Sequence, residues 1–216
     1  ALGEKSLFET TTGSYNTAVG QQALRLNTTA SENTAVGYQA GYSNTTGTAN
    51  AFNGYQAGYT NTTGSANTAF GHTALRQTTT ASNNTAVGYA AAYANTTGVH
   101  LSAFGNGALT GNTTGSYNTA FGSAALNFNT TASNNTAVGY QALYLNTESS
   151  NTAVGYQAGY NNAGGDYLTV VGYQAGKGNT SGRFNVAVGR DALLTNSTSN
   201  DNTAVGTNAL RLTTGA

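Results

Sequence analysis

A repeat with a period of about 17 residues runs along the whole chain and constrains its fold more than any other feature. The segment Asn33-Thr34-Ala35-Val36-Gly37-Tyr38-Gln39-Ala40 recurs with variations from one end to the other. Its glycine marks thirteen copies: Gly3, Gly20, Gly37, Gly54, Gly71, Gly88, Gly105, Gly122, Gly139, Gly155, Gly172, Gly189 and Gly206. These glycines are evenly spaced, except that the step from Gly139 to Gly155 is one position shorter. Such spacing indicates one small unit stacked along an axis, so residues 1–216 form a single repeat-array domain.

Each copy predicts short strands and no helix. The segment Asn-Thr-Ala-Val-Gly carries a β-branched residue and ends in glycine, which favours a strand of about five residues. A second strand is expected over residues 39–42 and their copies, and residues 44–47 form the turn that closes the coil. Apolar residues do not recur at helical spacing. We therefore expect an all-β fold, a parallel β-solenoid (β-roll) of about 13 coils, about 60 Å long at ~4.8 Å per coil.

Two columns of apolar residues, one of alanine and one of valine or phenylalanine, lie on opposite faces of the expected strand. Side chains alternate, so the alanine two places before the glycine and the Val or Phe one place before it project to opposite faces. The alanines suit a narrow interior, and the reverse assignment of the two columns is the alternative. The other column forms an apolar stripe of Val19, Val36, Phe70, Val87, Phe104, Phe121, Val138, Val154, Val171, Val188 and Val205. Such a stripe should be covered, and a homotrimer that buries it between chains is the simplest solution.

Other columns and two irregular copies carry structural predictions. Asparagine stands four places before the glycine, and we expect a structural ladder that includes Asn16, Asn33, Asn67, Asn84, Asn118 and Asn135. The copy Ala51-Phe52-Asn53 places Phe one position early, which predicts a local bulge or a register slip. The copy that is one residue short falls at residues 146–150 and should trim the turn while leaving the strand intact.

The composition excludes several partners. Seven basic residues balance seven acidic ones, and charged residues are 6% of the chain, so no basic stripe exists for nucleic acid. There is no cysteine and no long apolar run, so neither disulfides nor membrane insertion by this segment is expected. Leu, Val and Phe together number 33 of 216 residues, and Ile is absent. Because a single coil encloses little, we expect burial by other chains.

Catalysis is not expected. Asp191 and Asp201 lie in neighbouring coils but in different columns, which is weak support for a carboxylate pair. His72 and His100 also lie in different columns, without a second ligand or orienting partner. The glycine-rich tract 105–107 lacks a lysine and a following helix, so it does not predict a phosphate site. The chain is interpreted as a non-enzyme without a cofactor or metal.

Tyrosines form the most suggestive columns. They lie one and five places after the glycine: Tyr38, Tyr42, Tyr55, Tyr59, Tyr89, Tyr93, Tyr140, Tyr144, Tyr156 and Tyr160. Aromatic rings among Asn, Gln and Thr could form a glycan-contacting surface. The favoured interpretation is a stacked ladder that joins coil to coil.

Threonine and asparagine patterns raise two further hypotheses. Regular threonine arrays on a solenoid can bind ice, but Thr28 and Thr29 are adjacent in a turn, and the Thr17–Thr34 column is interrupted by Ala51, Ser102 and Val186. Asn-x-Thr/Ser sequons, such as the one at Asn44, are interpreted as turn residues.

The repeated Asn-Thr-Ala-Val-Gly-Tyr-Gln-Ala resembles the head repeats of trimeric autotransporter adhesins (Hep/Hag type) and similar β-roll arrays of phage tail fibres. The resemblance covers essentially all 216 residues. It implies a left-handed β-roll, intertwined or side by side in a homotrimer, that forms part of a longer fibre at a bacterial surface or on a virion. The implied function is a rigid spacer with weak contacts to cell-surface glycans. A filament made by end-to-end stacking and an ice-binding solenoid are the alternatives.

Overall fold

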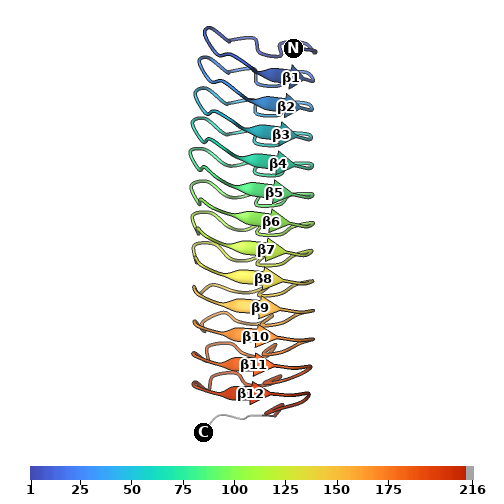
Figure 1. The fold of residues 1–216 in the computed structure, drawn as a ribbon, viewed down its shortest axis with the longest axis vertical. Coiled ribbons are helices and arrows are strands. Elements are labelled where there is room, and N and C mark those ends of the chain that lie inside the picture. The colour runs from blue at the N-terminus through green and yellow to red at the C-terminus, as the bar shows by residue number, and fades with distance from the viewer. Residues whose placement is uncertain (213–216) are drawn as a thin grey trace.

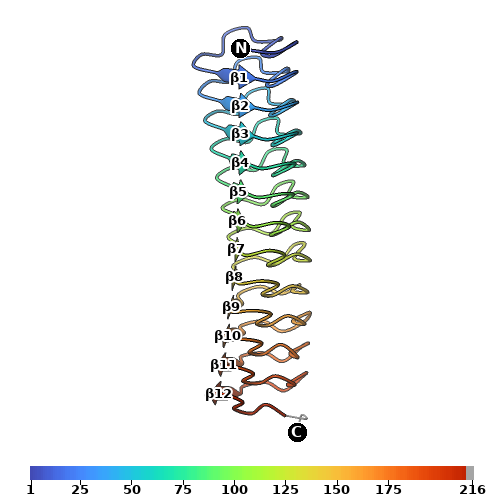
Figure 2. The ribbon, with the colours of Figure 1, turned by 90° about the vertical axis from the view of Figure 1, so that its right-hand side faces the viewer.

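The computed structural model describes residues 1–212, which form a parallel β-solenoid of about eleven turns (Figures 1 and 2). Twelve strands pair in sequence order in one sheet. They are β1 (Thr17–Val19), β2 (Thr34–Val36), β3 (Ala51–Asn53), β4 (Thr68–Phe70), β5 (Thr85–Val87), β6 (Ser102–Phe104), β7 (Thr119–Phe121), β8 (Thr136–Val138), β9 (Thr152–Val154), β10 (Thr169–Val171), β11 (Val186–Val188) and β12 (Thr203–Val205). No residue in the range 1–212 is helical. The predicted all-β parallel β-solenoid with a repeat of about 17 residues is confirmed.

The number of turns is smaller than the thirteen coils expected from the glycines. Twelve strands in sequence order enclose eleven turns. The first copy contributes no strand, because Leu2 forms only an isolated parallel bridge with Val19.

One strand per coil is observed, so the predicted second strand is wrong. Gln39 and Gly41 adopt left-handed φ angles of 53° and 59°, which an extended strand cannot contain. Their N–H groups still bond to neighbouring coils, to Gln21 O at 2.9 Å and Ala57 O at 2.9 Å. The intervening Ala40 N–H bonds within its own coil, to Gly37 O at 3.3 Å. This turn segment therefore satisfies its backbone groups without a strand.

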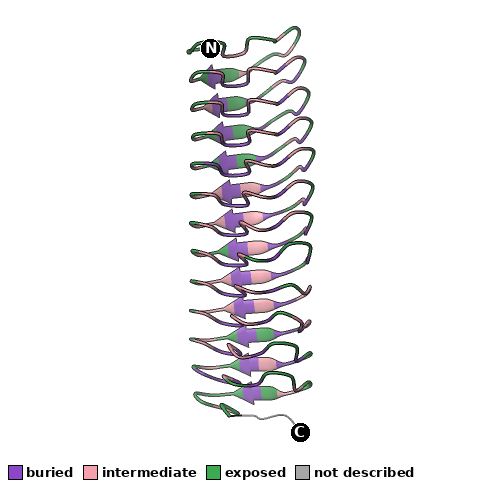
Figure 3. Ribbon diagram, turned by 180° about the vertical axis from the view of Figure 1, so that it is seen from behind, coloured by how far each residue is buried: buried purple, intermediate pink, exposed green. Residues whose placement is uncertain are grey.

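The interior is closed by a single chain. Each strand buries its middle residue and leaves the residues on either side half-buried or exposed. The buried positions form a purple band down the stacked strands in Figure 3. Ala18 is fully buried, whereas Val19 is 37% exposed, as the alternation predicts. Ala23 and Leu24 from the turn segment face the strand and are also fully buried. One chain thus builds a continuous core, mainly of Ala and Leu side chains, and burial of the apolar stripe by other chains stays a prediction.

The predicted bulge or register slip at Phe52 is wrong. β2 and β3 pair in the ordinary register, with Ala35 opposite Phe52. Phe52 points into the core and is 1% exposed. A Cβ on Gly41 would lie 2.7 Å from Phe52 Cδ2, and one on Gly58 would lie 2.4 Å from Phe52 Cε1. These glycines stand where other copies carry Leu, so they leave the space that the large ring fills.

The short copy behaves as predicted. Thr136 pairs with Thr152, which stands one position earlier in the sequence than the usual period would place it, and the strands stay in register. The missing residue is taken from the bend after Asn146: Asn146 Nδ2 donates to Glu148 O at 2.6 Å, two residues on. The equivalent Asn129 donates to Ala132 O, three residues on, at 2.9 Å.

Candidate functional site

Two asparagine columns run inside the coil rather than on its surface. The strand-side column lies four places before the glycine, and the turn-side column seven places after it. In the strand-side column, Asn50 N–H donates to Asn33 Oδ1 at 2.9 Å, and Asn50 Nδ2 donates to Gly64 O at 2.9 Å. These amides satisfy buried backbone groups, so their position indicates a structural role. Of the predicted ladder, Asn16 in the first coil is half-buried, and the fully buried members are Asn33, Asn67, Asn84, Asn118 and Asn135.

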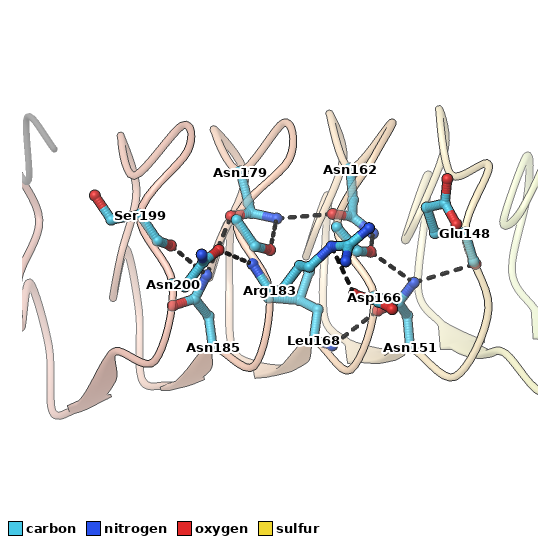
Figure 4. A network of polar contacts seen from close by, with 12 residues as sticks. Glu148, Asn151, Asn162, Asp166, Leu168, Asn179, Arg183, Asn185, Ser199 and Asn200 are labelled. Atoms are coloured by element: carbon cyan, nitrogen blue, oxygen red, sulfur yellow. Dashed lines mark hydrogen bonds and ion pairs between the residues drawn. The ribbon is translucent and has the colours of Figure 1, made fainter.

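The turn-side column contains most of the sequons; those at Asn83 and Asn134 lie outside it, at exposed positions. Asn44 Nδ2 donates to Asn27 Oδ1 at 3.1 Å and to Gly47 O at 2.9 Å, and Asn44 is 0% exposed. The same pattern continues to the last coils, where Asn179 Nδ2 donates to Asn162 Oδ1 at 2.7 Å (Figure 4). In the folded chain these side chains are inaccessible to a glycosylating enzyme.

The strand face carries two outward columns side by side. In most strands, Thr and Val or Phe flank the buried middle residue. Ala, Ser or Val replaces the Thr in β3, β6 and β11, and Asn53 replaces the Val or Phe in β3. The exposed members of the apolar stripe include Val19 and Val188 at 37%, Phe70 at 56%, Phe121 at 57% and Val205 at 70%. The stripe is therefore surface in the single chain, and its other members are half-buried or exposed. Phe104 and Phe121 stack with ring centroids 5.4 Å apart.

The predicted tyrosines form two stacked columns on the turn segment. We name them the first aromatic column (one place after the glycine) and the second aromatic column (five places after). In the first, Tyr38, Tyr55, His72 and Tyr89 stack in sequence with centroids 5.3, 4.8 and 5.2 Å apart. In the second, Tyr42 stacks on Tyr59 at 5.2 Å. Rings inside a column cover one another's faces, which favours a stabilising role for most of them. Both columns resume further along, at Tyr140, Tyr156 and Tyr173 in the first and at Tyr144 and Tyr160 in the second.

A column of glutamines follows the first aromatic column. Gln56 Nε2 donates to Gln39 Oε1 at 2.8 Å, and Gln39 Nε2 donates to Gln22 Oε1 at 2.8 Å. The amide column then stops. Thr73, Ala90, Gly107 and Ala124 occupy the next four copies, and glutamine returns at Gln141.

An open groove of about 520 Å³ lies where the glutamines stop. Tyr55, His72, Tyr89, Tyr93 and Arg76 line it together with Gln56, Thr73, Ala90 and Thr110. The small side chains of Thr73 and Ala90 take the place of longer glutamines, so they account for the hollow. We name it the Arg76 groove.

Arg76 is held firmly in this groove. Its Nε donates to Gln56 Oε1 at 2.8 Å and its Nη1 to Tyr93 Oη at 3.2 Å. The guanidinium carbon lies 5.2 Å from the centroid of Tyr59 and 5.8 Å from that of Tyr93, within cation–π range. Arg76 is also the one Asp, Glu, Lys or Arg between residues 33 and 147. The tyrosine pattern alone missed this residue, although its isolation in the charge distribution could have revealed it.

A second hollow of about 420 Å³ lies at Tyr173 and Arg190. Arg190 lies 5.8 Å from the Tyr173 centroid, but its Nε also pairs with Asp191 Oδ2 at 3.3 Å. The charge there is already paired. Asp166 and Arg183, shown in Figure 4, form a similar ion pair at 3.1 Å.

Residues considered for catalysis have structural positions. His72 stacks between Tyr55 and Tyr89, and His100 stacks on Tyr117 at 5.0 Å, so both replace tyrosine-like rings in columns. Asp191 is 7% exposed, whereas Asp201 is exposed. Within residues 1–212, no three His, Asp or Glu side chains lie together so that they could hold a metal ion. In the same range, no helix is long and apolar enough to cross a membrane.

The fold and surface together define a narrow parallel β-solenoid with an apolar strand face and stacked aromatic columns. Comparisons with protein-family models, with curated proteins and with solved structures found no match for the chain.

Proposed function

We propose that this chain is a rigid segment of an extracellular fibre, a homotrimer of β-rolls at a bacterial surface or on a virion. It acts as a spacer, and its aromatic columns supply weak contacts to cell-surface glycans. The observation that carries the proposal is the apolar stripe on the strand face.

The stripe runs from β1 to β12 and is interrupted once, by the exposed Asn53 in β3. Its exposed members range from Val19 in β1 to Val205 in β12. An apolar band of this length is costly in water, and covering it with the same band of identical chains requires no other partner. Because all strands are parallel and in register, three copies around one axis would keep the band in contact along its whole length.

A spacer must also resist bending and unfolding. Each coil is joined to the next by strand pairing, asparagine amides and stacked rings. Nearest-neighbour contacts of this kind make the stability of a solenoid grow with the number of coils. This supports a mechanical role more directly than a catalytic one.

The test is the mass of the native particle, measured by light scattering and sedimentation velocity. We expect a trimer. The triple variant Phe70→Lys, Val87→Lys, Phe104→Lys should become monomeric, because three charges would enter the interface. The matched control Ala49→Lys, Ala66→Lys, Asn83→Lys places the same charges on exposed residues of another column and should stay trimeric. A folded wild-type monomer would contradict the trimer.

Two alternatives predict other results. An ice-binding face needs a regular array, but the threonine column on the strand face is interrupted at Ala51, Ser102 and Val186, and Phe70 stands beside it. A monomer with thermal hysteresis would favour ice binding. A filament made by end-to-end stacking would instead appear by electron microscopy as particles much longer than one array.

A further inference from the structure

We propose that the Arg76 groove binds a saccharide that carries a carboxylate, such as a uronic acid. This inference rests on the glycan-contacting part of the proposed function and names the sugar class and the place. Four observations support it: an isolated charge, a fixed guanidinium, two uncovered ring faces and a hollowed floor.

The charge of Arg76 has no nearby counterion. None of the nine residues that line the groove is acidic. The nearest carboxylates along the chain belong to Glu32 and Glu148, each more than two coils away. At ~4.8 Å per coil, this exceeds about 10 Å, the Debye length at 0.1 M salt. The groove is therefore a locally cationic site in an otherwise uncharged stretch of the array.

The guanidinium is oriented before any ligand arrives. Gln56 and Tyr93 accept hydrogen bonds from Nε and Nη1, and the rings of Tyr59 and Tyr93 flank the plane. These bonds do not use Nη2, whose N–H groups are left for a ligand. An oriented guanidinium matches the planar geometry of a carboxylate and loses little side-chain freedom on binding.

Two rings in the groove have a face that no ring covers. Tyr89 stacks on His72 at 5.2 Å, and the next residue in its column is Asn106. Tyr93 has the Arg76 guanidinium on one side, and the next residue in its column is Thr110. Sugar rings pack against uncovered aromatic faces, whereas rings inside the columns have both faces occupied. The faces of Tyr89 and Tyr93 are thus the best place in this groove for a sugar ring.

The shape of the Arg76 groove, which is shallow and open to solvent, favours a sugar over an acidic peptide. Thr73 and Ala90 give a shallow hollow with hydroxyl and amide groups nearby, rather than a deep apolar pocket that would anchor a peptide side chain. One positive charge suits one acid group per site. We therefore expect weak binding, in the millimolar range typical of open polar sites.

The test compares two probes that differ at one position: methyl β-D-glucuronide, which carries a carboxylate, and methyl β-D-glucoside, which carries a hydroxymethyl group. Binding to the native particle is measured by ligand-observed NMR and titration. The glucuronide should bind about tenfold more tightly or better, since hydrogen bonds to charged groups are the stronger ones. The preference should fall as salt is raised.

Three variants locate the site, and each is checked for fold by circular dichroism. Arg76→Gln should abolish the preference for the glucuronide. Ala90→Gln restores the glutamine that this column carries elsewhere and should weaken binding of both sugars by filling the floor. Arg25→Gln is the matched control. Arg25 occupies the same column of the repeat as Arg76 and contacts Tyr42, but it lies outside the groove, where the glutamine column is unbroken. It should leave binding unchanged.

The outcomes separate the two proposals. Equal binding of both sugars, or a preference that survives Arg76→Gln, would overturn this inference while leaving glycan contact in place. An equal loss on Arg25→Gln would overturn the location. If neither sugar binds, this inference is wrong, and the trimeric spacer is then judged by particle mass alone. Tighter binding of a glutamate-containing peptide than of the glucuronide would also overturn it.

Discussion

Phe52 and Gly58 share one space in the core: a Cβ on Gly58 would lie 2.4 Å from Phe52 Cε1. The array thus exchanges the usual Ala and Leu for Phe and Gly without a change of register. A second exchange occurs further along, where a Cβ on Gly176 would lie 2.6 Å from Val170 Cγ1, and Val170 replaces the usual alanine. A larger side chain in one core column is therefore compensated by a glycine in another column, so that the total packed volume stays similar.

This pairing predicts strong coupling. Phe52→Ala should destabilise the chain by about 3–5 kcal/mol because it leaves a cavity. Gly58→Leu alone should also destabilise it, because the core is already full. The double variant restores the Ala and Leu of other copies and should be more stable than Phe52→Ala. Urea unfolding of the four proteins gives the coupling energy, and simple additivity would contradict the shared space.

A natural defect in the turn-side column predicts a stabilising substitution. Thr78 stands where other copies carry Asn, and both Thr78 Oγ1 and the neighbouring Asn61 Oδ1 are buried without a hydrogen-bond partner. Thr78→Asn would donate to Asn61 Oδ1 and continue the ladder. We expect a gain of about 1 kcal/mol in unfolding free energy.

The control for this change is Thr80→Asn, which alters an exposed threonine nearby and should have little effect. Hydrogen exchange should slow in the coils on both sides of residue 78. Equal stability of Thr78→Asn and the wild type would show that the two polar atoms are satisfied in another way.

The marker glycine combines an unusual backbone angle with a close approach between coils. Gly139 has a φ of 135°, and a Cβ there would lie 2.4 Å from Gly155 O. Gly206 has a similar φ of 123°, but a Cβ there would meet nothing within 4 Å. Gly206→Ala should cost only the backbone strain, about 1–3 kcal/mol, whereas Gly139→Ala should cost clearly more. Thermal unfolding of both variants separates the cost of backbone strain from the cost of the close contact between coils. Equal losses of stability would mean that the φ angle accounts for the whole effect.

The aromatic columns predict a difference between two substitutions of one residue. Tyr156 stacks on Tyr140 at 5.4 Å and on Tyr173 at 5.1 Å. Tyr156→Phe keeps the stack and should be nearly neutral. Tyr156→Ala should cost at least about 0.5–1.5 kcal/mol, the value of an aromatic pair. If urea unfolding gave the two variants equal stability, the column would not contribute to folding, and its tyrosines would need another explanation.

The period and the alternation made much of the fold predictable. Strand alternation predicts that Ala18 and Val19 lie on opposite faces, and the structure shows that Ala18 is the buried one. The trimmed turn before β9 follows from the spacing of Gly139 and Gly155. The second strand was wrong because Gln39 and Gly41 reverse the sign of φ, which residue type does not reveal for glutamine. The bulge at Phe52 was wrong because the compensating glycines lie in a different column.

The candidate site was only partly predictable. The tyrosine columns were apparent from spacing, and their stacking agrees with the structural interpretation. The Arg76 groove was not, because it depends on where glutamine is replaced by Thr73 and Ala90 and on where two ring columns end. These are relations between columns, and they become visible only when the coils are stacked.

The short coil between β8 and β9 has a consequence for how such arrays change in length. Losing one residue at the bend left Thr136 paired with Thr152 and the asparagine column continuous. The strand and the buried columns therefore set the register, while the bend tolerates a change in the number of residues. Duplication or loss of a whole repeat by recombination would leave every column aligned, so the array can change in length one coil at a time wherever the change does not separate coupled residues such as Phe52 and Gly58.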